Sequence, residues 1–183
     1  KLEYVFVTHG DADHINGIQE LLQNQKQGVE IDALVLPPEE YMDEKLLHLA
    51  EMAKENGTRV LTIYSGEEVG TYLKCIAPLA TRKNERTRGR MEAVPRLEAG
   101  NEASVVLELK DGAFQMLLTG DLEGRGEEQL VESGTLESCP ILKAGHHGSK
   151  NSGSEDFLQI VKPRLTLISA GIENRYGHPH AET

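Results

Sequence analysis

The chain alternates between short, dense apolar runs and longer stretches in which apolar residues recur with helical spacing. Runs rich in β-branched, aromatic and aliphatic residues, such as Tyr4-Val5-Phe6-Val7-Thr8, predict buried strands. Stretches with a three-to-four spacing predict helices that bury one face. The predicted strands are residues 4–8, 33–36, 59–64, 70–78, 103–109, 113–119, 140–144 and 165–169, and the predicted helices are residues 16–23, 39–56, 124–132 and a last one from Ser152 or Ser154 to about Val161.

Turn and cap residues mark several boundaries of these elements. Asn16 occupies the position of an N-cap for the first helix, and Gly57 that of a C-cap for the second. Asp111-Gly112 stands between two alternating apolar runs, which is a strong signal for a β-hairpin.

The order of the elements predicts one domain over residues 1–183 with an α/β or α+β fold. Strands and helices alternate along most of the chain, but the hairpin interrupts the alternation, which favours mixed sheets covered by helices. A chain of 183 residues is long enough for one substantial core, and we find neither a repeat nor a linker that divides it.

Residues 80–100 lack any period, are polar and basic, and contain Gly and Pro, so we expect a long, exposed, mobile loop. Its basic side chains are Arg82, Lys83, Arg86, Arg88, Arg90 and Arg96. Arg86 and Arg88 are candidate substrate contacts, although a merely solvated loop is an equal alternative. The net charge of −11 argues against a protein that coats nucleic acid non-specifically.

The bulk composition is that of a soluble domain, with 38% hydrophobic and 27% charged residues. No apolar run approaches the roughly 20 residues of a membrane span, and the chain opens on a strand rather than on a signal peptide. Cys75 and Cys139 are far apart and have no CxxC spacing, so we expect two reduced, buried thiols.

The candidate chemistry lies in polar clusters that directly follow four of the predicted strands. Six of the seven histidines fall in or beside these clusters, and only His48 lies elsewhere, on a predicted helix where a structural role is expected. Imidazole and carboxylate are good ligands for divalent metal ions, so the clusters together predict a metal site. The four clusters are His9, Asp11, Asp13 and His14; Asp121; His146 and His147; and Asn174, His178 and His180.

The spacing of the first cluster points to more than one ion. Alternate residues of a turn can point to one side, so His9, Asp11 and Asp13 can converge, and His14 adds a fourth donor. Four ligand-type side chains within six residues are too many for one ion, which indicates two adjacent metals with Asp121 as a plausible bridge. Each cluster alone has a simpler explanation, for example Asx turns at Asp11 and Asp13.

Residues 8–17 (THGDADHING) resemble the HxHxDH motif of metallo-β-lactamase-fold hydrolases, with Asp at the second ligand position and Gly at a position that is typically Pro. Residues 101–107 (NEASVVL), 118–122 (LTGDL), 142–149 (LKAGHHGS) and 174–180 (NRYGHPH) resemble the hydrolase domain of the ComEC family, the DNA-uptake channels of competent bacteria. The resemblance implies an αββα sandwich of two mixed β-sheets flanked by helices. Family domains usually begin with a β-hairpin that we expect to be missing here.

The resemblance also implies a ligand set. His9 and Asp11 resemble ligands of one ion, Asp13, His14 and either His146 or His147 resemble ligands of a second, and Asp121 resembles the bridging carboxylate. A further histidine of the superfamily has no counterpart, and Asn101 occupies that region. Such an oxygen-rich site favours Mn²⁺ or Mg²⁺, with Zn²⁺ as the other candidate.

The expected function is a metal-dependent phosphodiesterase or nuclease that degrades one strand of DNA during uptake, by attack of metal-bound hydroxide. Asp13 or Asp11 would orient the water, Asp121 would hold the ions, and His178 would steady a phosphate oxygen, helped by Ser149 or Asn174. The alternatives are a small-molecule phosphodiesterase similar to phosphorylcholine esterases, and a non-catalytic metal-binding module.

The expected partners are DNA, either single-stranded or one strand of a duplex, and the membrane channel portion of the same parent protein. The resemblance implies a soluble domain of a bacterial integral membrane protein, on the extracellular face of the membrane. As an isolated domain, we expect the chain to be monomeric.

Overall fold

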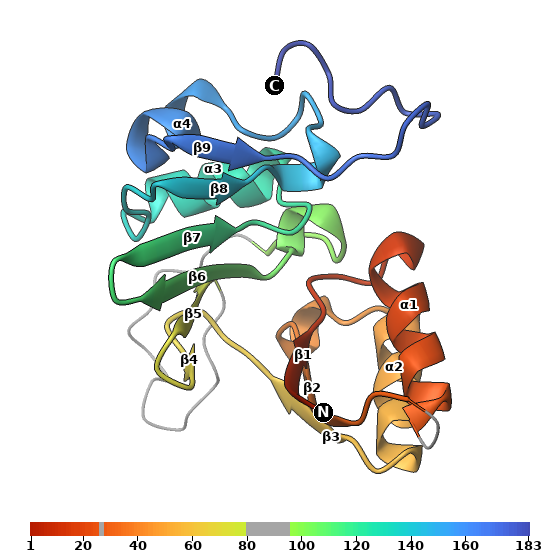
Figure 1. The fold of residues 1–183 in the computed structure, drawn as a ribbon. Coiled ribbons are helices and arrows are strands. Elements are labelled where there is room, and N and C mark those ends of the chain that lie inside the picture. Colours follow the sequence, from red (N-terminus) through yellow and green to blue (C-terminus); the bar gives the residue numbers. More distant parts are fainter. Residues whose placement is uncertain (26–27, 80–95) are drawn as a thin grey trace.

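The computed structural model describes residues 1–25, 28–79 and 96–183, and its strands form two sheets. The smaller sheet has the order β1 (Leu2–Phe6), β2 (Ile31–Leu36) and β3 (Arg59–Thr62), and all its strands are parallel. Helices α1 (Ala12–Gln23) and α2 (Glu44–Glu55) connect them and lie together along one side of this sheet (Figure 1). A single turn of 3-10 helix, η2 (Glu39–Tyr41), precedes α2.

The larger sheet is mixed. Its strands lie in chain order: β4 (Glu68–Val69), β5 (Leu73–Ala77), β6 (Val106–Asp111), β7 (Phe114–Leu118), β8 (Ile141–Lys143) and β9 (Leu165–Leu167). Pairs from β4 to β7 are antiparallel, whereas β7, β8 and β9 run parallel. Because the last three strands are parallel, their carboxyl ends meet at one edge of the sheet. Helices α3 (Gly124–Glu132) and α4 (Glu155–Val161) join these strands and pack against each other.

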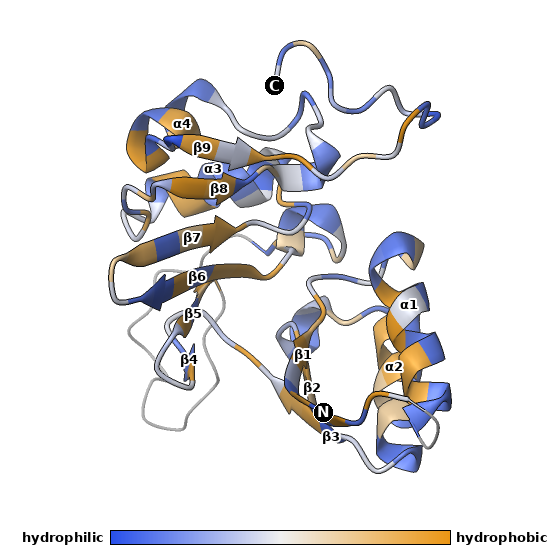
Figure 2. Cartoon of the chain, viewed as in Figure 1, coloured by the Kyte–Doolittle hydropathy of each residue, from blue (hydrophilic) through white to orange (hydrophobic). Residues whose placement is uncertain are grey.

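Three buried clusters show that the two sheets and their helices form four layers. One cluster packs α1 and α2 on the small sheet and includes Leu22, Leu34 and Leu49. A second lies between the two sheets and includes Val35 and Cys75. The third packs α3 and α4 on the large sheet. The hydropathy pattern agrees, since the helices turn polar residues outward (Figure 2), so the predicted αββα sandwich is confirmed.

Most predicted elements are present, but two helix starts are wrong. The first helix begins at Ala12, with Asp11 as its N-cap, rather than at Asn16. Asp13 and His14 therefore lie on the first helical turn and not in a loop. The second predicted helix is interrupted before Glu44, where Asp43 accepts a hydrogen bond from the Leu46 amide and caps α2. The first start was missed because the polar residues before Asn16 resemble a loop, and the second because apolar residues with helical spacing begin before Glu44, at Tyr41.

Other predicted boundaries agree with the structure. The predicted hairpin is present, with Gly112 and Ala113 as its turn residues, because Asp111 pairs with Phe114. Ser154 caps α4 by accepting a hydrogen bond from the Phe157 amide at 3.3 Å. The predicted basic loop falls largely on residues 80–95, which lie outside the described part of the chain.

Candidate metal centre

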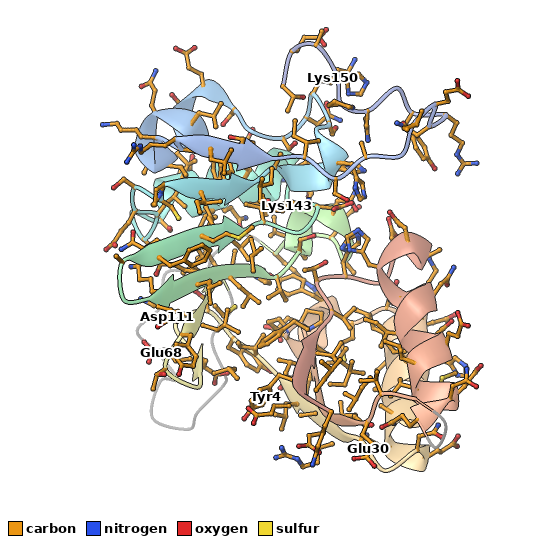
Figure 3. The ribbon with its side chains drawn as sticks, viewed as in Figure 1. Tyr4, Glu30, Glu68, Asp111, Lys143 and Lys150 are labelled. Carbon is orange, nitrogen blue, oxygen red and sulfur yellow. The ribbon has the colours of Figure 1, made fainter. Side chains whose placement is uncertain are left out.

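The predicted site residues come from both halves of the sandwich and meet where the strands end. His9 follows β1, Asp121 follows β7, and His146 and His147 form the short 3-10 turn η5 (Gly145–His147) after β8. Figure 3 labels Lys143, the last residue of β8, which lies shortly before η5 in the chain. Gly120, after β7, lets the backbone of the large-sheet half approach Thr8 of the small-sheet half closely. Its φ of 54° is positive, and a Cβ at this position would lie 2.9 Å from the Thr8 Cβ. Asp121 is thereby brought beside the first cluster.

Four side chains form a compact group of metal-ligand type: Asp13, His14, Asp121 and His147, whose ligand atoms lie within 4.8 Å of one another. Asp121 Oδ2 lies 3.2 Å from His14 Nε2 and 3.4 Å from His147 Nε2. His147 Nε2 also lies 3.1 Å from Asp13 Oδ2. The structure thus brings His147, rather than His146, into this group.

A second, smaller group adjoins the first. His9 Nε2 lies 3.7 Å from Asp11 Oδ2, and the His9 ring lies 4.2 Å from the ring of His14. Hydroxyl groups hold the other nitrogen of His9, since its Nδ1 is 3.0 Å from Thr8 Oγ1 and 3.3 Å from Ser104 Oγ. His9 is only 2% exposed, so its ring orientation is fixed by packing as well as by these contacts.

Unpaired polar atoms test whether these residues suit a metal. His9 Nε2, His14 Nε2, Asn101 Oδ1 and Asp121 Oδ1 are all buried without a hydrogen-bond partner among the described residues. Buried polar atoms are normally paired, so four orphans in one place call for a ligand. The contacts of His147 also indicate that a ligand binds here. Its Nδ1 lies 2.7 Å from the Ser169 carbonyl and must donate, which turns the lone pair of the neutral Nε2 toward two carboxylates. A bound cation resolves this contact, so the residues fit a metal.

His9 and Asp121 have the charge states that metal ligands need, whereas His14 does not. Burial, followed by repulsion from His14, lowers the pKa of His9, so its imidazole is neutral near pH 7. Burial alone would raise the pKa of Asp121, but contact with His14 outweighs burial and lowers it. Likewise, burial opposes a charge on His14, yet Asp121 raises the pKa of His14 overall. Binding of a metal ion at His14 therefore requires loss of the proton that its contact with Asp121 favours.

His146 is placed differently from His147. Its Nδ1 lies 2.7 Å from Glu123 Oε2, and its Nε2 lies 3.9 Å from Asp121 Oδ2. Neighbouring residues of a strand face opposite ways, but His146 and His147 both line the same cavity. The reason is the backbone, since φ is 40° at His146 and 55° at His147, in the left-handed region that non-glycine residues seldom adopt.

The compact group opens into a cavity of about 370 Å³ whose far wall is the loop after β9. His178 lies on this wall, with its ring 5.2 Å from that of His146, and burial together with the neighbouring histidines lowers its pKa. Tyr176 stacks on His178 at 5.8 Å between ring centres and is 61% exposed. An aromatic face is therefore offered at the mouth of the cavity.

Two residues that we expected to contact the substrate, Asn174 and Ser149, form hydrogen bonds with other groups of the protein. Asn174 accepts hydrogen bonds from the amides of Tyr176 and His178 and donates to the carbonyls of Gly171 and His178, so it shapes the loop. Ser149 is buried, and its hydroxyl lies 3.4 Å from Glu123 Oε2. In these contacts Asn174 shapes the loop that lines the cavity, and Ser149 lies against the carboxylate of Glu123. Arg86 and Arg88 lie outside the described residues.

A wider groove of about 580 Å³ adjoins the site on its other side and shares Asp11 with the cavity. Arg96 and Arg125 lie along this groove, together with Asn101 and with the acidic residues Asp11, Glu98 and Glu102. The site is thus flanked by a groove of mixed charge on one side and, on the other, by the exposed ring of Tyr176, which has the Arg175 guanidinium 4.7 Å from its centre.

Sequence reasoning missed several residues of this site. Glu123, Ser104 and Tyr176 all contact predicted site residues, yet none was singled out. Glu123 follows Asp121 by two residues, which was a usable signal, whereas the role of Ser104 depends on contacts across 95 residues of sequence.

Comparisons with known proteins bear on this arrangement. A family model described as the metallo-beta-lactamase superfamily matches residues 1–171. ComE operon protein 3 of Bacillus subtilis is 33% identical over 183 residues, covering 98% of this chain and 21% of that protein. Recombination protein 2 of Haemophilus influenzae is 42% identical over 82 residues, which are 45% of this chain and 10% of that protein. Competence protein ComA of Neisseria gonorrhoeae is 44% identical over 81 residues, which are 43% of this chain and 12% of that protein.

The chain spans about a fifth of the length of the Bacillus subtilis relative, and these relatives are competence proteins of the ComEC family. The matched span contains every residue of the compact group, and the two-sheet sandwich positions that group at the strand ends. The chain therefore belongs to the metallo-beta-lactamase superfamily.

Proposed function

We propose that this domain is a metal-dependent phosphodiesterase that cleaves DNA during competence-linked uptake. The observation that carries the proposal is the group Asp13, His14, Asp121 and His147, set beside His9 and Asp11 at the bottom of an open cavity. A site with nitrogen and oxygen donors in this number suits two divalent ions.

Each residue has a role in this proposal. Asp13, His14 and His147 would hold one ion, His9 and Asp11 would hold the other, and Asp121 would lie between them. Asp121 supports the bridging role because its Oδ2 faces His14 and His147 while its Oδ1 is buried and unpaired. When bound, such ions lower the pKa of water to about 7 and offset charge on a phosphate.

The chain's own residues would orient and bind the substrate around the ions. Asp13 is 63% exposed and borders the cavity, so its free oxygen can accept a proton from an attacking water. Asp11 borders both the cavity and the wider groove, and its carboxylate is the alternative proton acceptor. His178 faces the same space from the opposite wall, where it can donate to a phosphate oxygen.

DNA is favoured over a small substrate by the features on either side of the site. Arg96 and Arg125 line the groove on one side, among Asp11, Glu98 and Glu102. On the other side, the exposed ring of Tyr176 has the Arg175 guanidinium 4.7 Å from its centre. A single strand commonly binds through phosphate contacts to basic residues and base stacking on aromatic rings. The names of the relatives from Bacillus subtilis and Neisseria gonorrhoeae connect this family to competence.

The cellular setting is part of the proposal. We infer that the domain works on the extracellular face of the membrane, attached to a channel portion of the same protein that passes the surviving strand. Among the described residues, no helix is both long enough and apolar enough to cross a membrane.

A second candidate is a hydrolase of small phosphodiesters, favoured by the volume of the cavity. A space of about 370 Å³ falls within the usual range for small-molecule sites. Cleavage of a small chromogenic phosphodiester without any cleavage of DNA would favour this candidate.

The test is cleavage of labelled single- and double-stranded DNA with Mn²⁺, Mg²⁺, Zn²⁺ or EDTA. We expect activity with Mn²⁺ or Mg²⁺, because the site is rich in carboxylates, and none with EDTA. Asp121→Asn should reduce the rate by about 100-fold or more, since it removes charge shared by both ions. Asp111→Asn is a matched control, because Asp111 is exposed at the end of β6, beside the hairpin turn.

Two results would contradict the proposal. Cleavage that persists in Asp121→Asn would show that another residue or a contaminant is responsible. Calorimetry in which Zn²⁺ binds far more tightly than Mn²⁺, together with activity supported by Zn²⁺, would reject the proposed metal preference.

A further inference from the structure

The carboxylate of Glu123 joins two side chains that border the metal centre from different elements. Its Oε1 accepts a hydrogen bond from Asn101 Nδ2 at 3.0 Å, and its Oε2 lies 2.7 Å from His146 Nδ1. Asn101 begins the 3-10 turn η4 (Asn101–Ala103) and lines the wider groove, whereas His146 lines the main cavity. Glu123 therefore fixes two side chains on opposite sides of the site.

The hydrogen bond to Glu123 determines which way the Asn101 amide points. An ionised carboxylate only accepts hydrogen bonds, so it must face the Nδ2 group and not the amide oxygen. The oxygen Oδ1 is consequently turned away from Glu123. It is buried, and it has no hydrogen-bond partner in the part of the chain that the structure describes.

Two atoms of the metal centre, His9 Nε2 and Asp121 Oδ1, are likewise buried without a hydrogen-bond partner among the described residues. Asn101 also lines the same groove as Asp11, whose Oδ2 lies 3.7 Å from His9 Nε2. A buried carbonyl oxygen without a partner is costly, and a cation is one of the few groups that satisfies it. Amide oxygens are ordinary ligands of hard divalent ions.

We propose that Asn101 Oδ1 is a ligand of the ion held by His9, Asp11 and Asp121, and that Glu123 is the positioning residue that aims it. The inference rests on the two-ion centre of the proposed function. With Asn101 included, three of the four atoms that would bind this ion are oxygens. Such a ligand set favours Mn²⁺ or Mg²⁺ over Zn²⁺.

The experiment counts Mn²⁺ ions bound by the purified chain, by calorimetry and by the electron paramagnetic resonance signal of free Mn²⁺. The wild type should bind two ions. Asn101→Leu keeps the volume but removes the donor, so one ion should bind about 10- to 100-fold more weakly. Asn101→Asp retains an oxygen and should bind two ions. Glu123→Gln, which provides only one acceptor for two donors, should weaken the same ion by about 10-fold.

Glu98→Gln is the matched control, because Glu98 is exposed in the same groove and is not a partner of Asn101. Wild-type affinity for both ions in Asn101→Leu would overturn this inference alone. A wild type that binds no ion would overturn it together with the proposed function. A crystal structure of the Mn²⁺-loaded wild type provides a test that needs no variant. Asn101 Oδ1 in the coordination sphere supports the inference, and an amide turned away from the ion rejects it.

Discussion

At the residue scale, the role of each imidazole depends on which of its nitrogens the fold engages. The Ser169 carbonyl holds His147 Nδ1 and Glu123 holds His146 Nδ1, which leaves the Nε2 atom of both rings facing the Asp121 carboxylate. His9 is held through hydroxyl groups instead. Fixing one nitrogen of a histidine selects the tautomer and aims the other at the metal, so these contacts prepare the site before an ion arrives.

The exposed ring of Tyr176 leads to a prediction about substrate binding. Tyr176→Ala should raise the KM for a single-stranded oligonucleotide by about 10-fold, because stacking contributes about 1–3 kcal/mol per base. Tyr176→Phe keeps the ring face and should behave like the wild type. Steady-state kinetics on the oligonucleotide and on methyl p-nitrophenyl phosphate, which lacks a nucleobase, provide the measurement. An equal loss on both substrates would show that the ring supports the loop rather than the strand.

The two cysteines lead to a prediction about pH. Burial raises the pKa of the Cys75 thiol to about 12 and also raises that of Cys139. Neither thiol should react with a disulfide reagent at pH 8 in the native protein, and both should react in denaturant. Because the folded pKa of Cys75 exceeds its unfolded value, its contribution to stability is complete below about pH 9 and is lost as pH rises toward 12. Rapid native reaction of two thiols at pH 8 would contradict this assignment.

At the element scale, helix ends organise both sides of the site. The amino end of α1 carries Asp11, Asp13 and His14, so the positive end of the helix dipole faces the carboxylates and any bound phosphate. Glu123 is the N-cap of α3, which places its carboxylate two residues after Asp121. Each helix starts where a strand has just ended at the site, so short connections are enough to gather the ligands.

The junction of α3 and α4 gives a prediction about stability. Glu127 is 4% exposed, and its two oxygens accept hydrogen bonds from the amides of Gly153 and Ser154 at 2.7 and 2.8 Å. Glu127→Gln replaces one acceptor with a donor, so one buried amide loses its partner. The free energy of unfolding in urea should fall by about 1–3 kcal/mol.

Glu128→Gln is the control for this prediction, because Glu128 is exposed on the same helix. It should change the free energy of unfolding by less than about 0.5 kcal/mol. Equal effects of the two substitutions would show that the Glu127 carboxylate does not organise the start of α4.

At the scale of the whole molecule, the site joins the two halves of the sandwich. Asp13 and His14 belong to the half with the small sheet, whereas Asp121 and His147 belong to the half with the large sheet. Asp11, Asp13 and Asp121 also concentrate negative charge in a chain whose net charge is −11. Bound cations would therefore both link the halves and relieve repulsion.

Removal of metal should lower the stability of the whole domain. At a free Mn²⁺ concentration 100 times the dissociation constant, binding to the folded state contributes about 2.7 kcal/mol per site. The Tm should therefore rise with Mn²⁺ concentration and fall on addition of EDTA, as measured by scanning calorimetry. Asp121→Asn should show little response to either. Identical Tm values with Mn²⁺ and with EDTA would argue against metal binding at this site.

The sequence by itself determined most of the elements and the residue types of the site. The hairpin of β6 and β7, the cap at Ser154 and the αββα layers follow from local turn chemistry, from apolar periodicity and from a motif resemblance. These signals act over a few residues, so they can be read along the chain. The histidines and aspartates of the site stood out because they recur directly after apolar strands.

Only the tertiary structure decided how those residues combine. The grouping of His147 with Asp13, and the attachment of His146 to Glu123, depend on left-handed backbone angles that no local pattern indicated. The unpaired oxygen of Asn101 becomes visible only once η4 packs beside α3. Contacts of this kind join segments far apart in sequence, and their geometry is set by how the two sheets pack, which a linear pattern does not encode.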